Sequence, residues 1–209
     1  MATEYLDVFD SQHQLAGYAS REEVHRLGLW HQTFHCWIGG HYQGRLAILV
    51  QRRAKDKANH PGLLDISAAG HLQRGEGPED GVREIEEELG LHIGFDHLRF
   101  VNLSQESFRT ETEWNNEFCF EYAHVLNRPI TGEMFCFQDA EVAALYAADL
   151  ESLESLFASR EPAIVLHGWE NGPRQLVPVD HIVRCGDFVP RSLEYYRRWL
   201  SWFRGRAGS

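Results

Sequence analysis

The sequence predicts an α/β fold in which helices sandwich a mixed β-sheet, and three observations support this prediction. Runs rich in β-branched and aromatic residues, typical of strands, recur along the first two thirds of the chain. An amphipathic helix interrupts them near residues 78–89, and two more helical patterns follow late in the chain. Strands before and after one helix, with further helices behind them, favour one sheet covered by helices.

Four strands are expected in the first third of the chain, at residues 5–10, 33–40, 45–53 and 63–70. The second and third are separated by HYQG, which is typical of a hairpin connection. Residues 20–29 predict a short helix, because Ser20 is a good N-cap residue immediately before it. The fourth strand ends in glycine.

The helix predicted at residues 78–89 has clear boundary signals. Pro78 suits the first turn of a helix, and Gly90 suits its C-terminal stop. Apolar residues recur at spacings of three and four, at Val82, Ile85 and Leu89. The helix should therefore bury one apolar stripe and present a strongly acidic face.

The remaining elements follow from the same rules. Strands are predicted at residues 98–105 and 116–126, and helices at residues 150–159 and 190–204. The last helix has one apolar stripe, formed by Leu193, Tyr196, Leu200 and Phe203. This stripe predicts a terminal helix that docks on the core or on a second subunit, so a homodimer is one expectation.

Composition limits the classes of protein to consider. The chain has 209 residues, of which 43% are hydrophobic and 12% aromatic, and this indicates an ordered globular domain. Its formal net charge is −11. Because non-specific nucleic-acid binding depends on basic surfaces, no stable nucleic-acid partner is expected. A small phosphorylated ligand is still compatible with this charge if a metal ion supplies positive charge locally.

Cysteine spacing and the lack of long apolar runs predict a soluble cytoplasmic protein. The four cysteines are widely spaced and form no CxxC pair, which is typical of reduced thiols. The acidic start MATEYLDVFD lacks the apolar core of a signal peptide. No run approaches the roughly 18 apolar residues of a membrane span, so no membrane partner is expected.

The segment GHLQRGEGPEDGVREIEEELGL, residues 70–91, concentrates seven acidic residues behind a group of glycines. On a helix Glu84, Glu87 and Glu88 share one face, where unpaired carboxylates repel one another. Mg²⁺ and similar hard cations prefer oxygen ligands of this kind. Arg83 lies four residues before Glu87 and can hold its carboxylate in place. The segment therefore predicts a metal site, with a solvated acidic helix as the alternative.

This segment resembles the Nudix box, G-x5-E-x7-R-E-U-x-E-E-x-G-U, in which U is apolar. Gly70 and Glu76 match its first two fixed positions, and the other seven are matched by Arg83, Glu84, Ile85, Glu87, Glu88, Gly90 and Leu91. Six residues, 77–82, separate Glu76 from Arg83 where the pattern has seven. The shortened gap makes Glu76 the least secure match.

The resemblance implies a Nudix-type α/β/α sandwich that hydrolyses a nucleoside diphosphate linked to another moiety, or a similar organic pyrophosphate, with Mg²⁺ or Mn²⁺. It implies metal ligands at Glu84, Glu87, Glu88 and Glu76. Arg83, Glu87 and Glu88 would be the catalytic residues. The base that takes a proton from water stays open among Glu87, Glu88, Glu117 and Glu141. The Nudix domain would span residues 31–160, with 1–30 packed on it as an extension and 161–209 as a second extension.

A wider stretch, roughly residues 4–155, resembles the subgroup related to isopentenyl-diphosphate isomerase. Those isomerases carry a catalytic cysteine just before the box glycine, where this chain has Ala69. A methyl group cannot transfer a proton, so hydrolysis is favoured over isomerisation. A third alternative, a catalytically silent binding module, is disfavoured because the box carboxylates are all present.

His25, His31 and His71 are similar in order to the metal-binding histidines of these isomerases. With Glu117 they imply a second site for Zn²⁺ or Mn²⁺, since imidazole suits both ions. The chain has Asn115 where the isomerases have a further acid, which weakens the set. The alternative is that these histidines are ordinary polar residues of a helix and a half-buried strand.

Four residues are expected to contact the substrate. Gly70 and His71 lie at the start of the box and should be close to the phosphates. Arg52 and Arg53 follow a strand, and a guanidinium forms paired hydrogen bonds with phosphate oxygens. The alternative for both arginines is an exposed strand end.

Overall fold

In the computed structural model, which describes residues 3–57, 59–109, 114–137, 141–172 and 175–206, eleven strands form one mixed sheet. The strands are β1 (Tyr5–Phe9), β2 (Leu15–Ser20), β3 (Trp30–Tyr42), β4 (Arg45–Arg53), β5 (Leu64–Asp65), β6 (Ala68–His71), β7 (Arg99–Arg109), β8 (Trp114–Val125), β9 (Val142–Asp149), β10 (Ile164–Asn171) and β11 (Leu176–Val183). The helices are α1 (Arg21–Leu27), α2 (Arg83–Leu89), α3 (Leu150–Phe157) and α4 (Leu193–Arg204), with short 3-10 turns η1 (Asp80–Val82), η2 (Phe95–His97), η3 (Gly132–Met134) and η4 (Cys185–Asp187).

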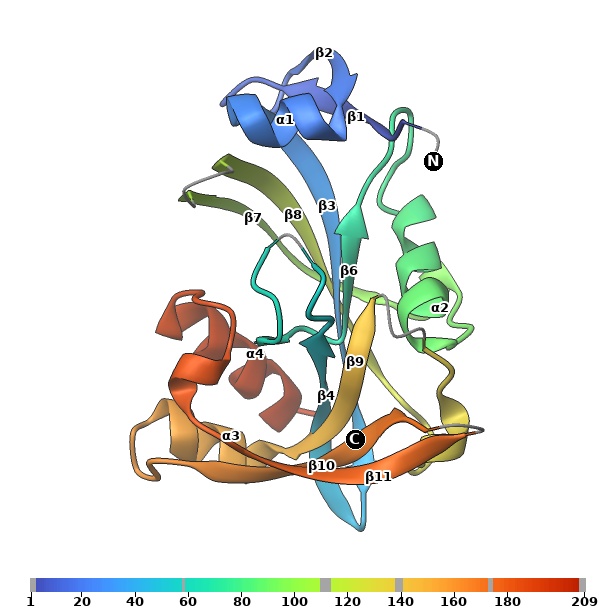
Figure 1. Cartoon of the computed structure of the whole chain (residues 1–209), viewed down its shortest axis with the longest axis vertical. Helices are drawn as coiled ribbons and strands as arrows, with labels where there is room; N and C mark the ends of the chain where they lie inside the picture. Colours follow the sequence, from blue (N-terminus) through green and yellow to red (C-terminus); the bar gives the residue numbers. More distant parts are fainter. Residues whose placement is uncertain (1–2, 58, 110–113, 138–140, 173–174, 207–209) are drawn as a thin grey trace.

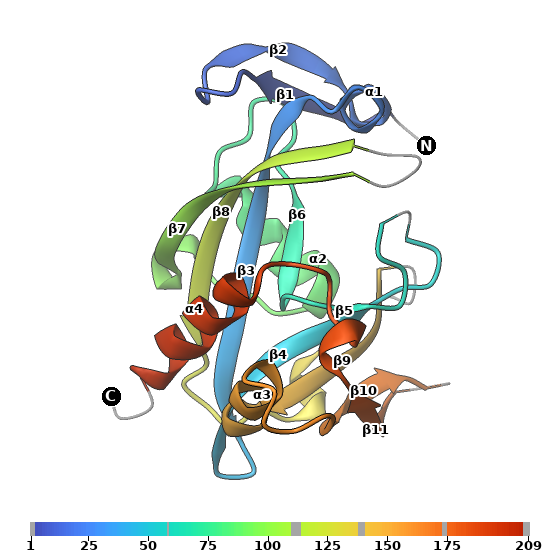
Figure 2. The same cartoon turned by 90° about the vertical axis from the view of Figure 1, so that its left-hand side faces the viewer.

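The long strand β3 organises the sheet. It pairs with β4 and β6 in the antiparallel sense and with β8 in the parallel sense. Figures 1 and 2 show β3 running the length of the molecule, with β1, β2 and α1 at one end and β10 and β11 at the other. The β3–β4 connection is a two-residue hairpin, in which Gln43 and Gly44 both have positive φ.

The sheet separates two hydrophobic cores, so the α/β/α arrangement predicted from the sequence is confirmed (Figure 1). On one side Trp37 and Ile48 pack with Trp199 of α4, next to α3. On the other side Cys36 packs with Ile85 of α2. Because Cys36 and Trp37 are neighbours on β3, adjacent residues of one strand serve opposite cores, as the two-residue repeat of a strand requires.

The strand predicted at residues 63–70 is wrong as one continuous element, because it is divided into β5 and β6. Ser67 lies at the break and is fully buried. Its hydroxyl accepts a hydrogen bond from the Ile38 amide at 2.8 Å and donates one to the Leu49 carbonyl at 2.6 Å. At this point the Ser67 side chain makes the hydrogen bonds that the backbones of β3 and β4 would otherwise make with each other.

The helix predicted at residues 78–89 exists, but its first turn is different. The α-helix begins only at Arg83, and the turn before it is the 3-10 segment η1. Gly81 in that turn lies against Phe34, where a β-carbon would be 2.5 Å from the phenylalanine side chain. The predicted stop at Gly90 is confirmed, since Gly90 adopts a left-handed conformation with φ of 71°.

The sequence patterns did not identify β2, β9, β10 and β11. Strand β9 is rich in alanine, which is a weak strand former. It is stabilised as a strand because it pairs with both β4 and β10. The C-terminal helix begins later than predicted, because Ser192 caps it by accepting a hydrogen bond from the Tyr195 amide at 3.1 Å. Leu193 then lies in the first turn and is 48% exposed, so its assignment to the buried stripe is wrong.

Candidate active site

A cavity of about 960 Å³ opens between the sheet, α1 and the box segment. Most of the predicted site residues line it, namely His25, Arg53, Gly70, His71, Arg83, Glu84, Glu87, Glu88, Glu117 and Glu141. Three predicted residues do not line it: His31, Arg52 and Glu76. Most of the box, His25, His71 and Glu117 therefore share one cavity, although they are far apart in the sequence.

Gly70 allows the carboxylate of Glu84 to approach the backbone of β6. A β-carbon at Gly70 would lie 2.0 Å from Cδ of Glu84 and 2.2 Å from its Oε1. These distances are far below an ordinary contact, so only glycine leaves room for the carboxylate. The first glycine of the box is thus required by the position of Glu84.

Arg83 connects the box segment at several points. Its Nε and Nη2 donate to the two carboxylate oxygens of Glu76 at 3.2 and 3.1 Å. Nη2 also donates to the carbonyl of His71 at 2.9 Å, and Nη1 contacts Glu84 and, at 3.3 Å, Glu87. Although burial alone would lower it, the pKa of Arg83 is raised by its hydrogen bonds to Glu76 and by the nearby carboxylates, so the guanidinium stays charged.

The paired hydrogen bonds also show how the shortened gap is accommodated. The turn η1 carries the chain from Glu76 back to Arg83 in six residues, and Asp80 closes that turn by accepting from the Gly77 amide at 2.9 Å. The Glu76 carboxylate accepts from Arg83 and from the Gln73 amide at 2.7 Å. Both carboxylate oxygens of Glu76 are therefore bonded to Arg83, and Glu76 does not line the cavity.

Glu84 and Glu88 are the least exposed carboxylates of the box: Glu88 is buried, and the Glu84 side chain is 12% exposed. Burial raises the pKa of Glu84 to about 7 and that of Glu88 to about 8. Glu88 accepts hydrogen bonds from the Ala69 amide and from Nε2 of Gln51, each at 3.0 Å on the same oxygen. No cation of the chain contacts Glu88 among the residues that the structure describes.

Glu87 differs from the other two because its side chain is 59% exposed, at the rim of the cavity. Together Glu84, Glu87 and Glu88 present hard oxygen donors toward one space, and two of them are buried without full charge compensation. This donor set fits a divalent cation such as Mg²⁺ or Mn²⁺, which prefers carboxylate ligands and would offset the cost of burying charge.

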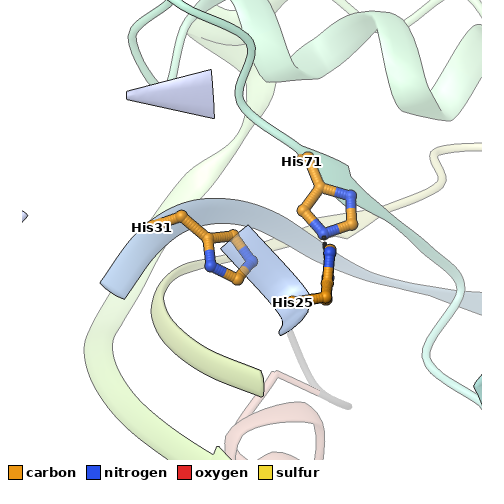
Figure 3. Close-up of side chains that lie close together, drawn as sticks. All are labelled: His25, His31 and His71. Atoms are coloured by element: carbon orange, nitrogen blue, oxygen red, sulfur yellow. Dashed lines mark hydrogen bonds between the residues drawn. The ribbon is translucent and has the colours of Figure 1, made fainter. Parts of the chain in front are cut away.

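His25, His31 and His71 gather beside the box, as Figure 3 shows. They come from α1, β3 and β6, and their ring centroids lie 5.1 to 5.2 Å apart. Nδ1 of His25 bonds the carbonyl of Arg21 at 2.7 Å, and Nδ1 of His31 bonds that of Leu29 at 3.0 Å. These carbonyls fix the Nδ1–H tautomer and leave both Nε2 lone pairs facing the cluster.

The ring nitrogens of the histidine cluster are arranged as they would be around a bound cation. Nε2 of His71 lies 3.3 Å from Nε2 of His25, while Nε2 of His31 is buried with no hydrogen-bond partner. Burial lowers the pKa of His31 and of His71, which favours the neutral form of imidazole that binds metal ions. The nearest carboxylate is that of Glu117, 4.0 Å from Nε2 of His31.

Glu117 occupies the centre of a polar group on β3 and β8. One of its oxygens accepts from Nδ2 of Asn115, and the other accepts from the Cys119 thiol at 3.5 Å and lies 4.0 Å from Nε2 of His35. Burial opposes its ionisation, but His31, His35 and Arg191 keep the pKa of Glu117 below its ordinary value. The parallel pairing of His31 with Glu117 brings the two clusters together.

The two predicted phosphate-binding arginines have different positions. Arg53 lines the cavity, held by the Asp65 carboxylate at 3.1 Å and by the carbonyl of Asn59 at 3.0 Å. Arg52 instead pairs with Glu170 on β10 at 3.5 Å. Neighbouring residues of a strand point to opposite faces of the sheet, which places the two side chains in different environments.

Sequence reasoning missed His35, Asp65 and Arg191, which also line the cavity. Arg191 comes from the segment before α4 and bonds Glu106, while its Nη2 lies 3.5 Å from Asp65. A signal existed for His35 alone: His31, Thr33 and His35 alternate along β3 and so share one face of the sheet.

Comparison with known proteins gives matches that span most of the chain. Residues 31–167 match the model of the NUDIX domain. The uncharacterized Nudix hydrolase CA_C0446 of Clostridium acetobutylicum is 33% identical over 198 residues, which are 94% of this chain and 95% of the relative. An uncharacterized Nudix hydrolase of Yersinia pestis is 38% identical over 199 residues, or 95% of this chain and 86% of the relative. Among solved structures, DR0079 from Deinococcus radiodurans superposes with a TM-score of 0.53 at 25% identity, over 76% of this chain and 91% of that chain.

Proposed function

Because the chain belongs to the Nudix hydrolase family, we propose that it cleaves the diphosphate bond of a nucleoside diphosphate linked to another moiety, using Mg²⁺ or Mn²⁺. Hydrolases of this family are pyrophosphohydrolases and generally use divalent metals. The observation that carries the proposal is the position of two carboxylates at the wall of a large polar cavity: Glu84 lies against Gly70, and the buried Glu88 accepts from the Ala69 amide.

In this mechanism each box residue has a distinct task. Glu84, Glu87 and Glu88 would hold the cation, and Arg83 orients Glu84 and Glu87 while Glu76 braces Arg83. A bound cation would supply positive charge to the diphosphate oxygens and acidify a nearby water molecule. Glu87 would then take the proton from water, since its carboxylate is exposed and, in the described part of the chain, is paired with Arg83 alone.

The substrate phosphates would lie between the carboxylates and the cationic side of the cavity. Arg53 is held in place by Asp65, and its guanidinium would contact a phosphate oxygen. His71 and Gly70 line the same space. Arg52 is left out of this proposal because it pairs with Glu170 and does not line the cavity.

The test is turnover of a panel of nucleoside-diphosphate derivatives with Mg²⁺. The variant Glu87→Gln should lose at least about 100-fold in kcat/KM if it removes the base or a ligand. Glu86→Gln is the matched control, because Glu86 is 58% exposed on the same helix but does not line the cavity. Equal turnover by Glu87→Gln and wild type would refute the role of Glu87.

The resemblance of residues 4–155 to isopentenyl-diphosphate isomerases suggests a competing reaction, which Ala69 argues against. Ala69 lines the cavity where those enzymes have a catalytic cysteine, and its amide only supports Glu88. The buried thiol of Cys119 does not line the cavity. Incorporation of deuterium from solvent into isopentenyl diphosphate would favour the isomerase, whereas its absence together with phosphate-bond cleavage favours the hydrolase.

We also propose that His25, His31 and His71 bind a second cation, Zn²⁺ or Mn²⁺. Glu117 lies 4.0 Å from Nε2 of His31 but belongs to a separate group with His35 and Cys119. The oriented imidazoles and the unpartnered Nε2 of His31 support this assignment. A cation here would fix α1 against β3 and β6, and so define one wall of the cavity. Metal analysis of purified protein and a thermal shift with added Zn²⁺ test it without any need for turnover.

Two further expectations are carried forward as predictions. No helix among the described residues is both long and apolar enough to span a membrane. The cytoplasmic location and the homodimer rest on the sequence alone, and fractionation and light scattering would test them.

A further inference from the structure

A second group of side chains with metal-binding atoms lies on the sheet face opposite the α2 core. It consists of His35 of β3 with Glu117 and Cys119 of β8, and we call it the floor cluster. Alternation along β8 puts Glu117 and Cys119 on one face, and the parallel register pairs Cys119 with Thr33, two residues before His35. The fold therefore gathers an imidazole, a carboxylate and a thiol, none of which belongs to the box.

The ligand atoms of the floor cluster are spaced as they would be around one ion. Oε2 of Glu117 lies 4.0 Å from Nε2 of His35 and 3.5 Å from Sγ of Cys119, and all three atoms lie within 4.8 Å of one another. Around a tetrahedral Zn²⁺, bond lengths of about 2.0 to 2.3 Å place two ligand atoms about 3.3 to 3.6 Å apart. Small side-chain rotations would therefore bring the three atoms to these distances.

The charge of Glu117 also supports a cation at this position. Glu117 is 8% exposed, and among the residues that the structure describes its ion-pair partners are the imidazoles of His31 and His35 alone, each at 4.0 Å. A buried carboxylate normally has a cation close to it, because the loss of its hydration is costly. A divalent ion bound by Glu117, a Cys119 thiolate and a neutral His35 would give a group with no net charge.

We propose that the floor cluster binds a Zn²⁺ ion, at a site separate from the box carboxylates and from the histidine cluster. Zn²⁺ accepts nitrogen, oxygen and sulfur ligands, whereas Mg²⁺ favours oxygen, so the thiol selects against the ion expected at the box. His35 and Glu117 line the cavity, and Cys119 does not. The protein therefore encloses the ion on the side of Cys119 and leaves the side toward the cavity for a water molecule.

The burial of Cys119 determines how the site fills. Its thiol is 0% exposed, so the ion is taken up as the chain folds and is then retained as a thiolate ligand set. The histidine cluster differs, because His71 is only half-buried and lines the cavity. Zn²⁺ added to the folded protein should therefore change the occupancy of the histidine cluster, whereas the floor cluster is filled during folding.

Cobalt substitution tests the proposal without any measurement of turnover. The full chain, with the exposed Cys136 and Cys185 replaced by serine, is unfolded in urea and EDTA and then refolded with Co²⁺. Recovery of the native circular dichroism spectrum confirms refolding. Because Co²⁺ replaces Zn²⁺ in such sites and absorbs in the near ultraviolet when bound to a thiolate, this two-serine protein should show a charge-transfer band, and refolding with Zn²⁺ in excess should abolish it.

Variants of the two-serine protein identify the ligands. Cys119→Ser keeps a similar size and loses the sulfur, so it should lose the band. Cys36→Ser is the matched control and should keep the band, because Cys36 is equally buried on β3 but packs in the α2 core. His35→Gln is a second variant in case Cys119→Ser does not fold, and it should weaken Co²⁺ binding at least about tenfold. His71→Ala should keep the band, since the histidine cluster consists of imidazoles.

Three results would overturn the proposal: no charge-transfer band in the refolded two-serine protein, a band that survives Cys119→Ser, or a band that Cys36→Ser abolishes. Loss of the band in His71→Ala would show that the thiol serves the histidine cluster, and so would refute a separate site. Failure of the hydrolase proposal leaves the band unchanged, because the floor cluster contains no box residue. The two proposals can therefore fail independently.

Discussion

Replacing Gly70 by alanine should inactivate the enzyme while leaving the fold intact. The new β-carbon would lie 2.0 Å from Cδ of Glu84 and within 2.3 Å of both its carboxylate oxygens. An ordinary contact needs well over 3 Å, so the carboxylate must move by more than about 1 Å. Glu84 is a flexible side chain, and it can leave the site without any displacement of the backbone.

The size of the effect follows from that displacement. Misplacing a catalytic group by about 1 Å can reduce a rate about 100-fold, which corresponds to about 2.7 kcal/mol in the barrier. The free energy of unfolding should change by less than about 1 kcal/mol, because Gly70 does not have a positive φ and alanine is sterically allowed there. Gly70→Ala should therefore lose activity while its free energy of unfolding stays close to that of the wild type.

The assay compares kcat/KM, its dependence on Mg²⁺ concentration, and the melting temperature. Gly186→Ala is the matched control, since a β-carbon at Gly186 meets nothing within 4 Å and its φ is not positive. Gly70→Ala should resemble Glu84→Gln in kcat/KM and should need more Mg²⁺. A Gly70→Ala enzyme with wild-type kcat/KM and an unchanged Mg²⁺ requirement would refute the assignment of Glu84 as a cation ligand.

Three further predictions concern charge, metal and stability. Asp65→Asn should destabilise the protein by about 3 kcal/mol at pH 7, because two partly buried arginines lose the buried carboxylate that they share. The pKa of Asp65 is held below its ordinary value of 3.8 by Arg191 and Arg53, against the effect of burial, so the difference in stability should narrow as the pH falls through and below 3.8, which urea denaturation at several pH values measures. Saturating Zn²⁺ should raise the melting temperature by about 5 °C in wild type and in His92→Ala, whose ring is 79% exposed, but not in His71→Ala; a rise in all three would exclude the histidine site. Chelation with EDTA should abolish hydrolysis and added Mg²⁺ should restore it, and turnover that persists in EDTA would contradict the proposed use of the box carboxylates.

The box could be identified from sequence because its signals are local. The apolar stripe of α2 and the glycine stop at Gly90 follow from helix geometry, and the fixed spacing of Arg83, Glu84, Glu87 and Glu88 follows from the same periodicity. The 3-10 turn before α2 was missed because its cause is tertiary. It depends on Gly81 packing against Phe34, which is far away in the sequence.

The rest of the cavity depends on contacts that no local pattern specifies. The parallel pairing of β3 with β8 decides that His31 lies opposite Glu117, and that register is set across more than eighty residues of chain. Asp65 shows the same dependence, since it bridges Arg53 of β4 and Arg191 near the C-terminus. The sequence predicts a phosphate contact for both Arg52 and Arg53, and no local pattern shows that Arg53 lines the cavity while Arg52 pairs with Glu170.

The alternation on β3 and β8 explains where the cavity ends. Facing away from the α2 core, β3 places His31, Thr33 and His35 and β8 places Asn115, Glu117 and Glu121, before the face becomes apolar at Trp37 and Ala123. A sheet face covered by helices is normally apolar, so these polar residues are an exception. Glu117 and Glu121 both belong to this polar face, yet only Glu117 lines the cavity. Glu121 is fully buried, because Arg198 of α4 donates to it at 2.8 Å and Ser104 bonds its other oxygen. The C-terminal helix therefore neutralises one part of the polar face and leaves the other open, so it determines the extent of the cavity even though it carries none of the box residues.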